Sequence, residues 1–122
     1  MAGIMGAHLI DREVARIFRI THVDNVPWIL AHGLHCQGAL LRDPGYVAIG
    51  NPDLIDRRTR RAVPVPPGGT LSDYVPFYFT PWSPMLFNIK TGRGVPMRPM
   101  SEIAILVSSI PRLEGLGIRY LV

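Results

Sequence analysis

The chain has 122 residues, of which 48% are hydrophobic and 18% are charged. This size and balance suit one compact domain with a buried core, and they exclude an intrinsically disordered chain and a pair of domains. Thirteen Lys and Arg residues against nine Asp and Glu residues give a formal net charge of +4, which favours polyanionic partners such as nucleic acids.

The cysteine content and the first residues of the chain indicate the cellular compartment in which the protein is expected. Cys36 is the only cysteine, which excludes an internal disulfide and a multi-cysteine zinc site. The first six residues lack the basic start and the apolar run of a signal peptide, and no apolar run approaches the roughly 18 residues of a membrane span. We therefore expect a cytoplasmic protein that does not enter the membrane.

The first predicted elements are a strand and a helix. Residues 17–22 alternate apolar and polar side chains and are rich in β-formers, which predicts a strand. Asp24 or Asn25 can cap a helix that has Pro27 in its first turn and Gly33 at its end. The apolar stripe of this helix is expected to consist of Val26, Ile29 and Leu30.

The middle of the chain is rich in turn-forming residues. Residues 43–45 (Asp-Pro-Gly) predict a turn. Asn51 followed by Pro52 predicts the start of a short helix over residues 52–58, since Asn is a good N-cap and Pro suits the first helical position. Residues 64–70 are expected to be extended and then to turn.

The second half is predicted to consist mainly of short strands, because prolines and glycines cluster between residues 64 and 99. Residues 75–79 predict a strand, and residues 84–89 predict either a helix or a second extended piece. The apolar run 102–107 predicts a central strand. The last residues, 118–122, are strand-like and apolar, so we expect the fold to continue past residue 122.

Several common catalytic motifs are absent. The sequence has no glycine-rich phosphate loop of Rossmann or Walker type, no His-Glu-x-x-His and no Gly-x-Ser-x-Gly. The four histidines are not spaced as metal ligands, so we predict no metal site.

His22 is the first candidate functional residue. As a structural residue it would be a half-buried strand histidine bonded to a carbonyl. As a functional residue, at the end of a strand and before a helix, it would hold a ribose hydroxyl or a phosphate.

Arginines and aromatic residues form two further candidate clusters. Arg57, Arg58, Arg60 and Arg61 form either a solvated face or a phosphate clamp, with one arginine pointing inward. Five aromatic residues follow between positions 74 and 82, and they form either core or a stacking surface. Composition and spacing alone indicate a basic α+β domain and do not predict an enzymatic activity.

Three stretches resemble the DarT family of DNA ADP-ribosyltransferase toxins. They are residues 19–34 (RITHVDNVPWILAHGL), 49–58 (IGNPDLIDRR) and 63–86 (VPVPPGGTLSDYVPFYFTPWSPML). The resemblance covers about residues 17–110. The third stretch is the most specific, because so long a string of proline, glycine and aromatic residues rarely arises by chance.

This resemblance implies a fold and an activity. The implied fold is a single α+β domain over residues 1–122, an ADP-ribosyltransferase-like split sheet around an NAD cleft, truncated on its C-terminal side. The implied reaction transfers ADP-ribose from NAD, as co-substrate, to a ring nitrogen of thymine in single-stranded DNA. The implied setting is a bacterial toxin whose cognate DarG-like antitoxin reverses the modification.

The resemblance also implies roles for individual residues. Arg58 is the expected catalytic arginine, with Arg57 as the alternative. The expected NAD contacts are Thr21, His22, Val23, Leu30, Gly38 and Gly50. The expected DNA contacts are Arg57, Arg60, Arg61, Tyr74 and Trp82.

The family's catalytic glutamate lies in a C-terminal segment that has no counterpart in these 122 residues. Glu102 begins a core-like strand, and Glu13 and Glu114 lie outside the matching motifs, so none of them is expected to replace it. We expect the 122-residue chain alone to have little or no transferase activity. Two alternatives are an RNA 2′-phosphotransferase-like enzyme of the same fold and a non-catalytic, basic binder of single-stranded nucleic acid.

Overall fold

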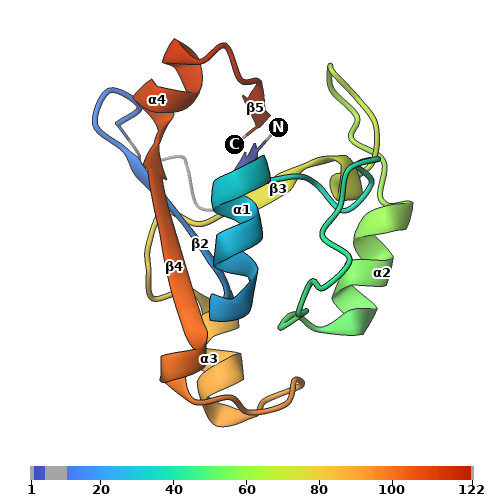
Figure 1. Cartoon of the computed structure of the whole chain (residues 1–122). Coiled ribbons are helices and arrows are strands. Elements are labelled where there is room, and N and C mark those ends of the chain that lie inside the picture. The colour runs from blue at the N-terminus through green and yellow to red at the C-terminus, as the bar shows by residue number, and fades with distance from the viewer. Residues whose placement is uncertain (1, 5–10, 122) are drawn as a thin grey trace.

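A computed structural model describes residues 2–4 and 11–121, and Figure 1 shows the arrangement of their helices and strands. The elements in chain order are β1 (Ala2–Ile4), β2 (Arg16–His22), α1 (Val26–His32), α2 (Pro52–Arg60), β3 (Val75–Phe77), α3 (Pro84–Thr91), β4 (Ile103–Ser109), α4 (Ile110–Gly115) and β5 (Tyr120–Leu121). Three short 3-10 turns lie between them: η2 (Val23–Asn25), η3 (Leu71–Asp73) and η4 (Met100–Glu102).

The strands form two sheets. In one, β1 lies between β3 and β5 and runs parallel to both. In the other, β2 and β4 pair antiparallel along their whole lengths, from Arg16 opposite Ser109 to His22 opposite Ile103. Phe18 and Tyr78 join the sheets by exchanging two backbone hydrogen bonds of 2.7 and 2.8 Å. The predicted α+β class is confirmed, with the sheet divided in two.

Two apolar clusters form the core, and β2 contributes to both. Ile17 packs in the first with residues of β3 and α4, including Phe77 and Ile110. Ile20 packs in the second with Ile49 and with residues of α3. Burying each such aliphatic side chain contributes about 1.5–3 kcal/mol, so β2 is held from both sides. This anchoring fixes the position of the residues at its C-terminal end.

Local signals in the sequence predicted several elements correctly. The strand at 17–22 is β2, and the helix that contains Pro27 and ends at Gly33 is α1. Residues 43–45 turn, and the Gly45 N–H donates to Asp43 Oδ1 at 2.8 Å. The helix after Asn51 is α2, and residues 84–91 are helical. At the start of each of the three helices, a capping residue or a proline marks the boundary.

Other predictions were wrong or missing. Leu30 does not join an apolar stripe, since its side chain is 81% exposed. The run at 102–107, most of which lies in β4, is not a central strand among the described residues, because β4 pairs only with β2 there and leaves Val107 60% exposed. Helix α4 was not predicted, although Ser109 caps it and Pro111 lies in its first turn. Pairing and burial depend on distant residues, which local patterns do not reveal.

Candidate functional site

His22 lies buried at the C-terminal end of β2, where the chain turns into η2. Its Nδ1 accepts a hydrogen bond of 3.0 Å from the Asp24 N–H. Because Nδ1 is the acceptor, the neutral ring carries its proton on Nε2. No described residue bonds to Nε2, so this N–H is available as a donor to an oxygen of a ligand.

Asn25 ties the end of β2 to the loop after α1. Its side chain is fully buried, and its Nδ2 donates to Thr21 Oγ1 at 3.0 Å and to the Val47 carbonyl at 2.9 Å. Its Oδ1 accepts the Val47 N–H at 2.8 Å. The Thr21 hydroxyl is therefore engaged, and Thr21 as a whole is only 1% exposed, so neither its side chain nor its backbone is open to a ligand in this structure. Val23 is partly buried in the adjacent turn.

Helix α2 begins where the sequence predicted. The Asn51 side chain accepts the Asp53 N–H at 2.9 Å and the Leu54 N–H at 3.4 Å. Pro52 occupies the first turn, where its missing N–H costs nothing. This start sets the helical phase of the arginines one to two turns later.

Arg58 is the one arginine of the predicted cluster that is partly buried. Its Nη2 donates to the Leu71 carbonyl at 2.8 Å and to the Tyr74 carbonyl at 3.2 Å. The other three arginines of the cluster, Arg57, Arg60 and Arg61, are exposed. Arg60 forms an ion pair with Asp56. The single inward arginine that the spacing suggested is therefore present.

The segment that holds Arg58 is itself fixed by local hydrogen bonds. Asp73 Oδ2 accepts the Thr70 N–H at 2.8 Å, which closes the η3 turn. Gly69 has a φ of 78°, and a Cβ at this position would lie 2.5 Å from Asp73 Oδ2. The Tyr74 hydroxyl donates to the Gly68 carbonyl at 2.8 Å. Glycine is thus required where the chain turns back toward the Arg58 side chain.

Arg19 is a second inward arginine, which the sequence reasoning missed. Its Nη1 donates to the Pro76 carbonyl at 3.2 Å, and its Nε is buried with no hydrogen-bond partner among the described residues. Burial lowers the pKa of Arg19, and the nearby phenols of Tyr46 and Tyr78 partly oppose this. The position of Arg19 between two apolar residues of the predicted strand, Phe18 and Ile20, is the sequence signal that could have identified it.

Arg19 and Arg58 lie close enough for their charges to interact. Burial, and next the positive charge of Arg19, lower the pKa of Arg58. The arginine–carboxylate ion pairs found among the described residues involve Arg60 and Arg98, so neither inward arginine has a carboxylate partner in that part of the chain. Two neighbouring cations without a counter-charge favour an anion beside them.

The remaining predicted contacts lie in varied surroundings. The Gly38 N–H donates to the Ser72 carbonyl at 3.2 Å, and a Cβ on Gly38 would lie 3.0 Å from Asp73 Oδ1. A Cβ on Gly50 would lie 3.3 Å from Ile55 Cδ1. Both glycines therefore allow close packing of the chain on the segments around Arg58.

The two predicted stacking residues differ in exposure. Tyr74 is only 2% exposed, so its ring has no free face, and the predicted stacking on a DNA base is wrong for this residue. Trp82 is 82% exposed, and its indole ring is open to solvent. Leu30, an expected NAD contact, is also largely exposed.

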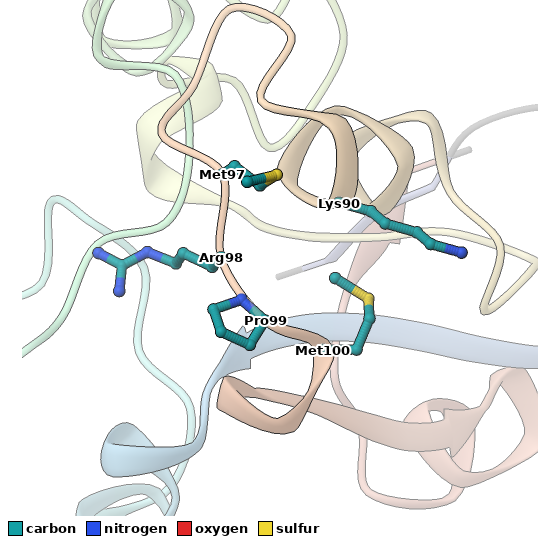
Figure 2. Close-up of a pocket in the computed structure, with 5 residues that line it drawn as sticks. All are labelled: Lys90, Met97, Arg98, Pro99 and Met100. Atoms are coloured by element: carbon teal, nitrogen blue, oxygen red, sulfur yellow. The ribbon is translucent and has the colours of Figure 1, made fainter.

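Two cavities lie away from these residues. Figure 2 shows one of about 260 Å³ beside α3, where the charged ends of Lys90 and Arg98 point away from one another. The other, of about 350 Å³, has a mainly apolar lining contributed in part by β4 and α4. Neither brings polar groups together as a ligand site does. In the described part of the chain, no cluster of three or more metal-binding side chains and no helix long and apolar enough to span a membrane is found.

Comparison with known proteins identifies relatives of the chain. The family described as "ssDNA thymidine ADP-ribosyltransferase, DarT" matches residues 18–121. A DNA ADP-ribosyl transferase of Escherichia coli O127:H6 (strain E2348/69 / EPEC) is 55% identical over 102 residues, which are 83% of this chain and 47% of the relative. A DNA ADP-ribosyl transferase of Thermus sp. (strain 2.9) is 40% identical over 111 residues, covering 88% of this chain and 51% of the relative.

Solved structures of a DarT protein also match this chain. Thermus sp. 2.9 DarT in complex with ADP-ribosylated ssDNA superposes with a TM-score of 0.77 at 40% identity, covering 86% of this chain and 50% of that one. The same protein in complex with NAD+ gives a TM-score of 0.68 at 39% identity, covering 84% and 48%. The chain thus spans about half the length of these relatives, and the predicted resemblance and fold class are confirmed.

Proposed function

The chain belongs to the DarT family, and we propose that it forms the NAD-facing half of an enzyme that transfers ADP-ribose from NAD to thymine in single-stranded DNA. The observation that carries this proposal is the inward placement of Arg58. It alone of the four clustered arginines is bonded to the segment before β3, and no described carboxylate neutralises it. The DarT relatives bound to NAD+ and to ADP-ribosylated ssDNA support the choice of substrates.

The reaction makes definite demands on the site. The bond between nicotinamide and ribose C1′ breaks, and nicotinamide leaves with the electron pair. Thymine N3, the ring nitrogen not bonded to deoxyribose, forms the new bond to C1′ and loses its proton to solvent. The site must therefore stabilise negative charge on the thymine ring and hold one face of the ribose open.

Arg58 meets the first demand. Two of its five N–H groups are used on backbone carbonyls, and the remaining three can donate to the thymine carbonyl oxygens. Its lowered pKa makes these N–H groups stronger donors to a developing anion. A guanidinium stays charged near neutral pH, so Arg58 acts as a cation and not as a proton acceptor.

Three of the other proposed NAD contacts lie at the end of β2 or directly after it. The free Nε2–H of His22 suits a ribose hydroxyl or a phosphate oxygen. Val23 and the buried Thr21 lie beside it in the chain, and Leu30, Gly38 and Gly50 complete the proposed set. The glutamate that stabilises the cationic ribose would come from a segment that corresponds to the C-terminal half of the relatives.

Exposed arginines and an exposed indole would hold the DNA. Arg57 and Arg60 on α2 and Arg61 directly after it are exposed, so they can contact phosphates. Trp82 offers a free ring, and stacking one base on such a ring contributes about 1–3 kcal/mol. We also propose the biological setting that the family implies: a cytoplasmic toxin paired with a DarG-like antitoxin.

The proposed activity is tested in a chimaera that joins this chain to the C-terminal half of the E. coli relative. We expect it to add ADP-ribose from NAD to a thymine-containing single-stranded oligonucleotide, detected by mass spectrometry. An oligonucleotide in which cytosine replaces every thymine is the control. Equal modification of both oligonucleotides, or of neither by a folded chimaera, contradicts the proposal.

The 122-residue polypeptide is the second arm of the same experiment. Without the glutamate it should transfer little or no ADP-ribose, since losing one group that stabilises transition-state charge costs about 10²–10³ in rate. Transfer by the short chain at the rate of the chimaera contradicts this expectation.

A further inference from the structure

Arg19 and Arg58 come from different elements but are hydrogen-bonded to the same short segment. Arg19 Nη1 donates to the Pro76 carbonyl, and Arg58 Nη2 donates to the Tyr74 carbonyl, each at 3.2 Å. Tyr74 is extended, with φ −118° and ψ 141°, and leads into β3. Carbonyls two residues apart in an extended strand point the same way and lie about 6–7 Å apart. One edge of this segment therefore aligns both guanidiniums.

Arg19 is partly buried, and Asp or Glu partners for it are absent from the described residues. Its Nε is buried and has no partner among the described residues, and burial lowers its pKa. A partly buried cation without a counter-charge is costly, so its presence calls for an explanation other than stability. Its charge acts on Arg58, whose pKa is lowered first by burial and then by Arg19.

Resting on the proposed role of Arg58, we propose that Arg19 is a positioning residue for that arginine. Arg19 occupies the Pro76 carbonyl and repels the neighbouring guanidinium, which confines Arg58 Nη2 to the carbonyls of Leu71 and Tyr74. This leaves the Nε–H and both Nη1 hydrogens of Arg58 for the reacting thymine. Without Arg19, the Pro76 carbonyl becomes an alternative acceptor, and Arg58 loses its single orientation.

The first test uses the 122-residue chain labelled with ¹⁵N-arginine and follows the Nε–H signal of Arg58 by NMR. Arg19→Met should move this signal more than Arg16→Met does, because Arg16 is an exposed arginine of the same strand. Arg19→Lys keeps the charge and should leave the signal closer to its original position. An Arg58 signal that responds equally to Arg19→Met and Arg16→Met overturns the proposal.

If Arg19→Met does not fold, the reciprocal variant Arg58→Met tests the same coupling between the two arginines. Arg58 lies on a helix near the surface, so Arg58→Met should fold, and it should move the Nε–H signal of Arg19. Arg57→Met, on the same helix but exposed, should not. If the Nε–H signal of Arg19 does not move in Arg58→Met, the proposed coupling between the two arginines is contradicted.

The second test uses the chimaera and separates positioning from binding. Arg19→Met should lower kcat roughly tenfold with the KM for NAD nearly unchanged, and Arg19→Lys should restore part of kcat. A raised KM with unchanged kcat would make Arg19 a substrate contact and overturn the proposal. An unmodified chimaera with no transfer at all refutes the proposed function instead, while the NMR result stands independently.

Discussion

Asn25 shows how a single residue organises the candidate site. It is the most completely buried polar side chain described, and its amide joins Thr21 on β2 to both backbone groups of Val47. The sequence suggested Asn25 only as a helix cap, yet it makes no capping bond to α1. A long-range role of this kind depends on which loop returns to the strand, and the local sequence does not contain that information.

Replacing Asn25 with Ala should lower the free energy of unfolding by roughly 3 kcal/mol, because buried partners lose their hydrogen bonds. Asn88→Ala on α3 is the matched control, since Ala has the higher helix propensity and no side-chain bond of Asn88 is seen among the described residues. Urea denaturation measures both. Similar free energies for the two variants would show that the bridge to Val47 contributes little.

Tyr120 should titrate at an unusually high pH. The Tyr120 hydroxyl donates to Glu114 Oε1 at 2.6 Å, and this bond is the main cause that raises the pKa of Tyr120, ahead of burial and the Glu114 charge. The stability it contributes is fully present below the unfolded tyrosine pKa near 10 and is lost as pH rises through the folded value.

The Glu114→Gln variant should therefore move the Tyr120 titration to lower pH. Phenolate absorbance gives the measurement, with Tyr120→Phe subtracted in each background to remove the other tyrosines. An unchanged or higher pKa in the Gln variant contradicts the assigned cause.

At the scale of elements, the turn from Gly68 to Tyr74 connects α2 to β3 and supplies carbonyls to Arg58. The proline-glycine-aromatic string was the strongest family signal, and the structure gives it a physical basis. Positive φ angles at two glycines and the Thr70–Asp73 hydrogen bond shape a turn that other residues would not adopt. Local chemistry predicted the turn but not that Arg58 would dock on it.

Gly69→Ala should destabilise the protein more than Gly68→Ala. Both glycines have φ near 78–79°, so each substitution carries the left-handed backbone cost of about 1 kcal/mol. Only at Gly69 would the new methyl also meet Asp73 Oδ2, whereas nothing lies within 4 Å at Gly68. Thermal denaturation compares the two, and equal losses would rule out the steric role of Asp73.

At the scale of the whole molecule, the division between predicted and unpredicted features follows sequence distance. Strand β2, the α2 start at Asn51 and the turn at 43–45 were predicted because capping, proline and alternation act locally. The pairing of β1 with β3 and β5, and the meeting of Arg19 with Arg58, were not. They join residues tens of positions apart, and no local pattern encodes such contacts.

The basic charge of the whole chain agrees with both a DNA-modifying enzyme and a non-catalytic DNA binder, and NAD separates them. The most direct measurement is the melting temperature of the 122-residue chain with increasing NAD. A ligand that binds only the folded state raises this temperature with concentration. We predict a saturable rise that is reduced in His22→Ala and kept in Arg57→Met. No rise with NAD, together with salt-sensitive binding to single-stranded DNA, would contradict an NAD-facing half-site in this chain.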